Sequence, residues 1–194
     1  MAHLKFNMDK LERLNDPGRF DSLPPDVFWP ALGALPADAT IVEIGAGTGL
    51  FAAAFAARAP EATVYAADTA DEMLEWMRAN RPEVADGRMV PLKAEETHVP
   101  LASGVADAVY MINLHHELAH PAESYAEAFR LLKPGGHLLV VDWAPRETPK
   151  GPPPEVRVSV EALAALLHDA GFAEVAIDDT TLEWHLMATA VRPR

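Results

Sequence analysis

A glycine-rich turn is the segment of this sequence best suited to bind a ligand. The run from Ile41 to Leu50, IVEIGAGTGL, has the pattern of a buried strand that enters a turn and opens a helix. Gly45, Gly47 and Gly49 permit positive φ angles and leave no Cβ in a ligand's path, and free N–H groups at a helix start can meet a carboxylate or a phosphate. A tight turn without a ligand is the alternative interpretation.

The spacing of the glycines and a preceding acid indicate the kind of ligand. Dinucleotide-binding turns follow G-x-G-x-x-G, whereas Gly45, Ala46, Gly47 and Gly49 belong to a G-x-G-x-G turn. Glu43, just before the turn, would repel a diphosphate and attract an ammonium group. The turn is therefore predicted to bind a zwitterionic amino-acid group.

Acidic residues also follow the next two predicted strands. Asp68 lies about 20 residues past the turn, where a carboxylate can accept hydrogen bonds from both hydroxyls of a ribose. Thr69 comes next, and Met73 could lie flat against a purine or belong to the core. Ala94–Glu96 follows the third strand, where it could contact an adenine amino group or form a solvated loop.

A literal zinc-site pattern occurs further along the chain. His116, Glu117 and His120 match H-E-x-x-H, which places two zinc ligands on one face of a helix with the Glu as general base. Pro121 follows directly and disfavours the helical conformation at His120, and no third ligand is marked downstream. No metal site is therefore predicted, and a zinc hydrolase is kept as an alternative.

An α/β fold must position these residues. Short β-branched runs alternate with helical segments, which predicts βαβ units and a parallel sheet covered on both faces. Seven strands are predicted, at Thr40–Ile44, Thr63–Ala67, Met89–Lys93, Ala106–Asn113, His137–Asp142, Glu174–Ile177 and Glu183–Val191, and helices at Leu50–Arg58, Asp71–Ala79, Ala122–Leu132 and Val160–Ala170. Ser159 should cap the last of these helices and Gly171 should close it. The few residues between the last two strands predict an antiparallel hairpin.

The segment before the first strand is predicted to be a cover. Residues 1–39 contain an amphipathic piece with Leu4, Phe6, Met8, Leu11 and Leu14, followed by proline-containing turns. Helices packed on the domain and a lid over the carboxyl edge of the sheet are both consistent with this pattern. The predicted division is a helical cover at 1–39 and a ligand-binding domain at 40–194.

Composition narrows the class of protein. The chain has 194 residues, 16 Lys and Arg against 29 Asp and Glu, and a net charge of −13, which disfavours nucleic acid and anionic membranes as partners. The chain has no cysteine, which excludes disulfides and thiolate chemistry. Neither a signal peptide nor a membrane span is predicted, so we expect a cytoplasmic protein.

Five motifs together resemble the class I S-adenosylmethionine-dependent methyltransferases, of the small-molecule type found in ubiquinone and menaquinone biosynthesis. They are VEIGAGTG (42–49), ADTADEML (67–74), AEE (94–96), VPLASGVADAV (99–109) and RLLKPGGHL (130–138). The resemblance implies a Rossmann-like three-layer sandwich with a mostly parallel seven-stranded sheet of order 3-2-1-4-5-7-6 and an antiparallel strand seven. It assigns Glu43 and the glycine turn to the methionine part of the cofactor, Asp68 to the ribose and Glu95 to the adenine, although the family more often has Asp at the last position.

The resemblance also implies a reaction. Asn113, Leu114, His115 and His116 would line the pocket beside the cofactor's methyl group, with either histidine as a general base or as a residue that orients the acceptor. Loop histidines without a chemical role are the alternative. The expected cofactor is S-adenosyl-L-methionine, the product S-adenosyl-L-homocysteine, and the partner a small-molecule acceptor. A non-catalytic sensor that binds the cofactor is a further alternative, and no oligomeric state is predicted.

Overall fold

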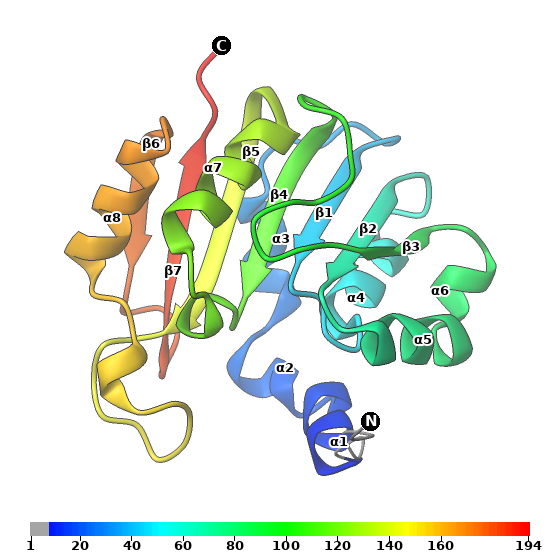
Figure 1. Cartoon of the computed structure of the whole chain (residues 1–194), viewed down its shortest axis with the longest axis horizontal. Helices are drawn as coiled ribbons and strands as arrows, with labels where there is room; N and C mark the ends of the chain where they lie inside the picture. The colour runs from blue at the N-terminus through cyan, green and yellow to red at the C-terminus, as the bar shows by residue number, and fades with distance from the viewer. Residues whose placement is uncertain (1–7) are drawn as a thin grey trace.

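A twisted sheet forms the centre of the protein, whose computed structural model describes residues 8–194 (Figure 1). Within these residues the sheet has seven strands in the order β3-β2-β1-β4-β5-β7-β6. Neighbouring strands from β3 to β5 are parallel, whereas β7 is antiparallel to β5 and β6. The strands are β1 (Thr40–Ile44), β2 (Thr63–Asp68), β3 (Met89–Lys93), β4 (Ala106–Ile112), β5 (Leu132–Trp143), β6 (Ala173–Asp178) and β7 (His185–Val191). The predicted fold class, strand order and antiparallel hairpin are confirmed.

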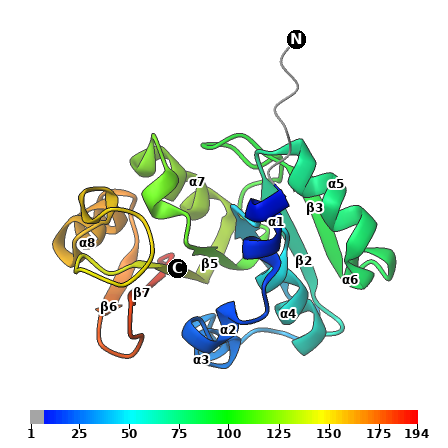
Figure 2. The same ribbon diagram turned by 90° about the horizontal axis from the view of Figure 1, so that it is seen from below.

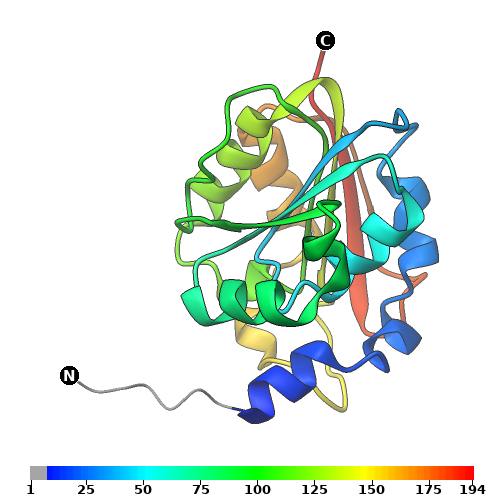
Figure 3. The ribbon, with the colours of Figure 1, turned by 90° about the vertical axis from the view of Figure 1, so that its right-hand side faces the viewer.

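Helices cover both faces of the sheet. They are α1 (Met8–Asn15), α2 (Arg19–Ser22), α3 (Pro25–Ala31), α4 (Leu50–Arg58), α5 (Asp71–Asn80), α6 (Pro82–Ala85), α7 (Pro121–Leu131) and α8 (Val160–Asp169), with single 3₁₀ turns η1 (His115–Glu117) and η2 (Pro154–Val156). Ile41 belongs to the core shared with α3, α4 and α5, whereas its neighbour Val42 belongs to the core shared with α7 and α8. Successive strand residues face opposite sides, and a sheet buried on both sides therefore needs the continuous apolar strands seen in the sequence. Figure 3 shows the resulting layers edge-on.

Every predicted element boundary but the start of β5 lies within two residues of the observed one, and three differences have a clear cause. β5 begins at Leu132 instead of His137, because Leu132 pairs with Ala106 of β4, and Gly135 N–H also donates to Arg192 O (2.7 Å) just after β7. β7 begins at His185 instead of Glu183, because the Asp178 carboxylate holds the preceding turn through the N–H groups of Thr180 (2.7 Å) and Thr181 (3.0 Å).

The third difference is that β4 ends at Ile112, since Asn113 has a φ of 56° and turns the chain out of the sheet. The short helix α6 was not predicted. The predicted caps of α8 are confirmed, because Ser159 Oγ accepts from Ala162 N (3.1 Å) and Gly171 has a φ of 96°.

The segment before β1 folds as three helices within its described part. Phe28 and Leu32 are fully buried, and the rings of Phe28 and Phe51 lie 6.3 Å apart, so α3 shares the core of α4. Figure 2 shows α1 in front of the carboxyl ends of the central strands. Leu4 and Phe6 of the predicted amphipathic piece lie outside the described residues. None of the helices within residues 8–194 combines the length and the apolar character needed to cross a membrane.

Candidate functional site

The glycine turn links β1 to α4 through three residues that have no Cβ of their own. Gly45, Gly47 and Gly49 have φ angles of 75°, 54° and 67°, a region that residues with a Cβ rarely adopt. The N–H groups of Gly45 and Ala46 both donate to Ala67 O, at 2.9 and 3.0 Å. The turn therefore lies against the end of β2.

Asp68 fastens this turn from the end of β2. Its two carboxylate oxygens accept hydrogen bonds from Gly47 N (2.7 Å) and from Ala70 N (2.8 Å). Two hydrogen bonds to backbone N–H groups orient the carboxylate beside the glycine turn. Asp68 thus lies beside the turn at the same edge of the sheet, as the predicted ribose contact requires.

Glu43 is a buried carboxylate beneath the turn. It is 2% exposed, and its Oε2 accepts a hydrogen bond from the Tyr110 hydroxyl at 3.1 Å. Burial raises the pKa of Glu43 to about 8, although the Tyr110 hydrogen bond and the positive charge of Arg19 act in the opposite direction. Burial also lowers the pKa of Arg19, against the negative charge of Glu43. A carboxyl group from β1 and a guanidinium from α2 therefore lie near the turn, and burial disfavours the charged form of each.

The residues that follow β2 and β3 have different surroundings. Ala94 is buried and donates its N–H to Asp68 O at 3.0 Å, so the end of β3 is joined directly to Asp68. Glu95 is exposed, whereas Glu96 Oε1 accepts from His120 N at 2.6 Å and so holds the start of α7. Met73 is buried on α5, and Thr69 is exposed.

The ends of these strands form a continuous edge. The order β3-β2-β1-β4 places Ala94, Asp68, the glycine turn and Asn113 next to one another in that order. Neighbouring strands lie about 4.8 Å apart, so the first three strand ends span roughly 10 Å. An adenosine joined to an amino acid can lie along such an edge, with its base near β3 and its amino-acid group near β1. The residues present therefore fit S-adenosylmethionine.

Two leucines cover the glycine turn from elements far apart in sequence. A Cβ on Gly45 would lie only 2.5 Å from Leu114 Cδ1, so Leu114 packs directly on this glycine. A Cβ on Gly47 would lie 3.6 Å from Leu14 Cδ1 of α1, which is an ordinary van der Waals distance. Arg81 joins the two regions, because it donates to Thr48 O (2.9 Å) in the turn and to Asn15 Oδ1 in α1. The N-terminal helix is thereby held over the candidate site.

The two candidate catalytic histidines follow β4 and have separate partners. His115 Nδ1 lies 2.7 Å from the Tyr125 hydroxyl, and the two rings are stacked. His116 Nδ1 lies 2.8 Å from Asp142 Oδ1, near the end of β5. The pKa of His115 is lowered by burial. Burial acts on His116 in the same direction, but the hydrogen bond and charge of Asp142 outweigh it and raise the pKa of His116 above its ordinary value.

The zinc-site pattern does not have the geometry that its function requires. His116 lies in the 3₁₀ turn η1, and His120 has a non-helical φ and ψ of −129° and 65° immediately before α7. The two histidines therefore do not lie on one face of a single helix. Across residues 8–194, no three His, Cys, Asp or Glu side chains are grouped so that they could hold a metal ion.

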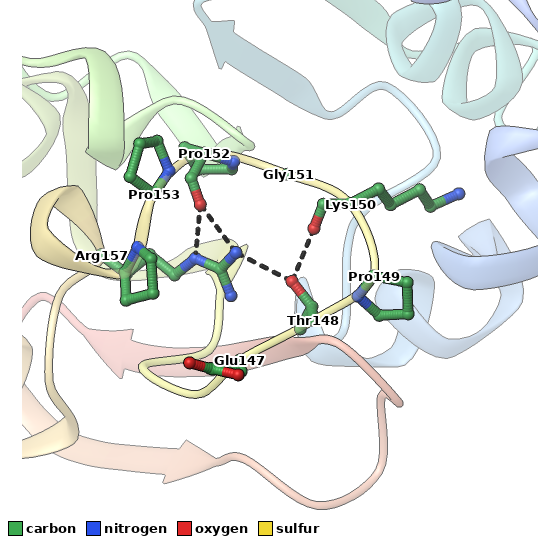
Figure 4. Close-up of a pocket in the computed structure, with 9 residues that line it drawn as sticks. Glu147, Thr148, Pro149, Lys150, Gly151, Pro152, Pro153 and Arg157 are labelled. Carbon is green, nitrogen blue, oxygen red and sulfur yellow. Dashed lines mark hydrogen bonds between the residues drawn. The ribbon is translucent and has the colours of Figure 1, made fainter.

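The long loop after β5 is organised around one buried arginine. Arg157 is 8% exposed and donates to the carbonyl oxygens of Ala144, Arg146 and Pro152 and to the Thr148 hydroxyl. Figure 4 shows this guanidinium at the centre of the loop, which encloses a cavity of about 330 Å³ lined by residues 147–154 and Arg157. The loop lies at the carboxyl edge, beside Trp143.

Sequence reasoning did not identify Arg19, Asp142 or Arg157 as site residues. Asp142 carries a signal that could have identified it, namely an acid at the end of the apolar run LLVV (138–141). Arg19 and Arg157 have no comparable local pattern, because only the folded chain brings them to this edge.

The chain is similar in sequence to known methyltransferases. A family model described as "Methyltransferase domain" matches residues 42–140. The ubiquinone/menaquinone biosynthesis C-methyltransferase of Bordetella avium is 34% identical over 115 residues, covering 58% of this chain and 44% of the relative. The demethylmenaquinone methyltransferase of Thermus thermophilus is 36% identical over 112 residues, covering 57% of this chain and 49% of the relative. The chain thus spans about half the length of these relatives.

Solved structures resemble almost the whole chain. A SAM-dependent methyltransferase from Aquifex aeolicus has a TM-score of 0.86 at 27% identity, covering 97% of this chain and all (100%) of that one. Phosphoethanolamine N-methyltransferase 2 of Haemonchus contortus, in complex with S-adenosyl-L-methionine, has a TM-score of 0.80 at 13% identity, covering 96% of this chain and 57% of that one. The second likeness concerns the fold alone.

Proposed function

The chain belongs to the family of methyltransferase domains, and we propose that it transfers the methyl group of S-adenosylmethionine to a small-molecule acceptor. The observation that carries this proposal is the order of strand ends along the carboxyl edge, where Ala94, Asp68 and the glycine turn follow one another. A cofactor held there would place its methyl group near Asn113 and Leu114, at the end of β4.

The residues at the edge would divide the cofactor among them. Asp68 would receive the ribose hydroxyls, and the backbone from Ala94 to Glu96 would face the adenine. The glycine turn, with Glu43 beneath it and Arg19 nearby, would hold the ammonium and carboxylate groups of the methionine part. When bound, the cofactor supplies an activated methyl group and a neutral leaving group, so the protein must mainly align the acceptor and exclude water.

The acceptor is proposed to be a small molecule. The relatives from Bordetella avium and Thermus thermophilus are named for quinone substrates, which supports an acceptor of similar size. The net charge of −13 disfavours a nucleic acid. Its place would lie between the histidine segment after β4, the loop around Arg157 and the N-terminal helices.

Two measurements test the proposal. Titration calorimetry should detect binding of S-adenosylhomocysteine, and labelled S-adenosylmethionine should transfer its methyl group to at least one member of a panel of phenols, amines and quinols. The absence of any binding would refute the proposal. Binding without transfer to any acceptor would favour the sensor alternative.

A further inference from the structure

A second polar cluster lies one and two strands beyond the glycine turn. The β4–β5–β7 register places Ile112 beside Val141 and Trp143 beside His185, so the residues after β4 meet the end of β5 and the start of β7. Asp142 is 1% exposed, and its Oδ1 accepts from Trp143 N at 2.7 Å and lies 2.8 Å from His116 Nδ1. Burial of a carboxyl group is costly unless hydrogen bonds or a compensating charge stabilise it, and here Trp143 N and His116 are the partners of Oδ1.

We propose that His116 and Asp142 form a proton-accepting pair for a hydroxyl-bearing methyl acceptor, with Asp142 as the residue that positions His116. This inference rests on the proposed methyltransferase function. It selects one of the two candidate histidines, adds a residue that the sequence did not single out, and names the chemical class of the acceptor.

The hydrogen bonds determine which nitrogen can accept a proton. A carboxylate can only accept, so Nδ1–H of His116 donates to Asp142, and in the neutral ring Nε2 carries the lone pair. The side chain of His116 is 13% exposed, and its Nε2 lies 3.8 Å from an oxygen of Glu117, which is itself 60% exposed. Nε2 therefore lies on the side of the exposed Glu117 carboxylate, away from Asp142.

The other nearby histidines do not meet these requirements. His115 has its Nδ1 on the Tyr125 hydroxyl and its ring stacked on Tyr125, and burial lowers its pKa despite the negative charge of Asp142. His185 is 1% exposed, and burial lowers its pKa to about 4, so it stays neutral. Neither ring combines access to solvent with a hydrogen bond to a carboxyl group.

Position also favours His116. Leu114 packs on Gly45, and His116 follows two residues later in η1. A methyl group delivered at the end of β4 would therefore lie near the segment that carries His116. The pair is thus close to the place where an acceptor must lie, and it is joined to the sheet through Asp142.

The reaction balances without any further reagent. The acceptor's O–H bond breaks, its proton moves to His116 Nε2, and the electron pair stays on the acceptor. This electron pair then forms the new bond to the methyl carbon. The attacking atom is the oxygen itself or a ring carbon that shares its negative charge. The carbon–sulfur bond breaks at the same time and leaves a neutral thioether. A methylated ring carbon then loses its own hydrogen as a proton to water. His116 returns its proton to solvent.

The charges around His116 give the reaction a pH dependence. Asp142 and Glu117 raise the pKa of His116, while burial and the positive charge of Arg157 lower it, and His115 lies close by. Because the proton acceptor is neutral His116, turnover should rise with pH and level off above the pKa of this residue. Removing the carboxylate at Asp142 should shift that rise to lower pH.

The test combines a matched pair of probes with three variants. The probes are 1,4-dihydroxynaphthalene, kept reduced, and 1,4-dimethoxynaphthalene, which lacks the hydroxyl protons. We expect methylation of the first probe only. His116→Ala should lower kcat by about 100-fold or more and flatten the pH profile, the usual cost of losing a general base. Asp142→Asn should lower the pH midpoint and kcat with little change in affinity for S-adenosylhomocysteine, whereas His115→Ala should keep the shape of the profile.

Further controls separate the possible failures. His168→Ala, an exposed change of the same type on α8, should leave kcat and its pH profile unaltered. Asp142 also accepts a hydrogen bond from Trp143 N, so Asp142→Asn could fail to fold. In that case NMR titration of the wild type and of Glu117→Gln replaces it. In both proteins the pKa of the His116 imidazole must lie above its ordinary value. Methylation of neither probe by a protein that binds S-adenosylhomocysteine would overturn the acceptor class and leave the proposed function intact. An unchanged pH profile in His116→Ala would overturn the role of the pair.

Discussion

Substitution of Glu43 by Gln should abolish a proton release that accompanies cofactor binding in the wild type. With a pKa of about 8, about nine-tenths of the folded, ligand-free molecules carry a neutral Glu43 at pH 7. An ammonium group bound beside the carboxylate favours its ionised form, so the proton must leave. The expected release is about 0.9 proton per ligand at pH 7, about 0.5 at pH 8 and about 0.1 at pH 9.

Calorimetry in two buffers measures this release directly. Titration with S-adenosylhomocysteine in phosphate and in Tris gives binding enthalpies whose difference is proportional to the protons released. Gln has the size of Glu but does not titrate, so Glu43→Gln removes this contribution and leaves that of every other group. Equal proton release by the two proteins at pH 7 would refute the assignment of Glu43 to the ammonium group.

The same pKa shift predicts how stability depends on pH. An unfolded Glu loses its proton near pH 4.5, whereas folded Glu43 keeps it up to about pH 8, so the folded state binds more protons between these values. Stability of the ligand-free protein should therefore fall as pH rises through this window, by up to about 1.4 kcal/mol per pH unit. Urea unfolding of Glu43→Gln at pH 5 and at pH 8 should lack this contribution. If the difference in unfolding free energy between the wild type and Glu43→Gln were the same at both pH values, the raised pKa of Glu43 would be contradicted.

Other predictions concern the turn, the ribose contact and the long loop. Gly87 has a φ of 82° and open space around it, so Gly87→Ala should lower the free energy of unfolding by about 1 kcal/mol in urea titrations. The new Cβ of Gly45→Ala would also lie 2.5 Å from the Leu114 side chain, so this variant should lose at least about 1 kcal/mol more. Equal costs would show that the neighbouring side chain yields freely. Asp68→Ala should weaken binding of S-adenosylhomocysteine by about 10-fold or more in calorimetry, while the exposed Asp38→Ala should not change it. Arg157→Lys should cost about 1–3 kcal/mol and speed proteolysis within residues 147–153, because Lys cannot reproduce the planar set of donors; an unaltered cleavage rate would contradict its role in the loop.

The fold was predictable because its determinants are local. Apolar runs of four to seven residues, helix caps such as Ser159 and Gly171, and the short connection before β7 each act within a few residues. The strand order itself came from the resemblance to a known family. The end of β4 was placed one residue too late, because Asn113 was assigned to the strand although Asn adopts a positive φ more often than most residues.

The candidate site was predicted unevenly. The glycine turn and Asp68 could be recognised because their spacing along the chain is tied to one strand–turn–helix unit and the next strand. Glu96 shows the opposite case, since its carboxylate binds His120 N and so stabilises the start of α7. A residue next to a strand end has several possible partners, and its neighbours along the chain do not say which one it meets.

The sequence by itself therefore determined the α/β architecture, the glycine turn and the acids that follow the first strands, since each depends on periodicity or spacing within a short segment. Only the tertiary structure decided that His116 pairs with Asp142, 26 residues away, and that His115 pairs with Tyr125 instead. The physical reason is that β4 and β5 are parallel neighbours, so the register between them, set by packing on both faces of the sheet, places the end of one strand beside the end of the other. The folded chain also buries Glu43, which raises the pKa of its carboxyl group, and brings Arg19 close enough for its positive charge to act in the opposite direction.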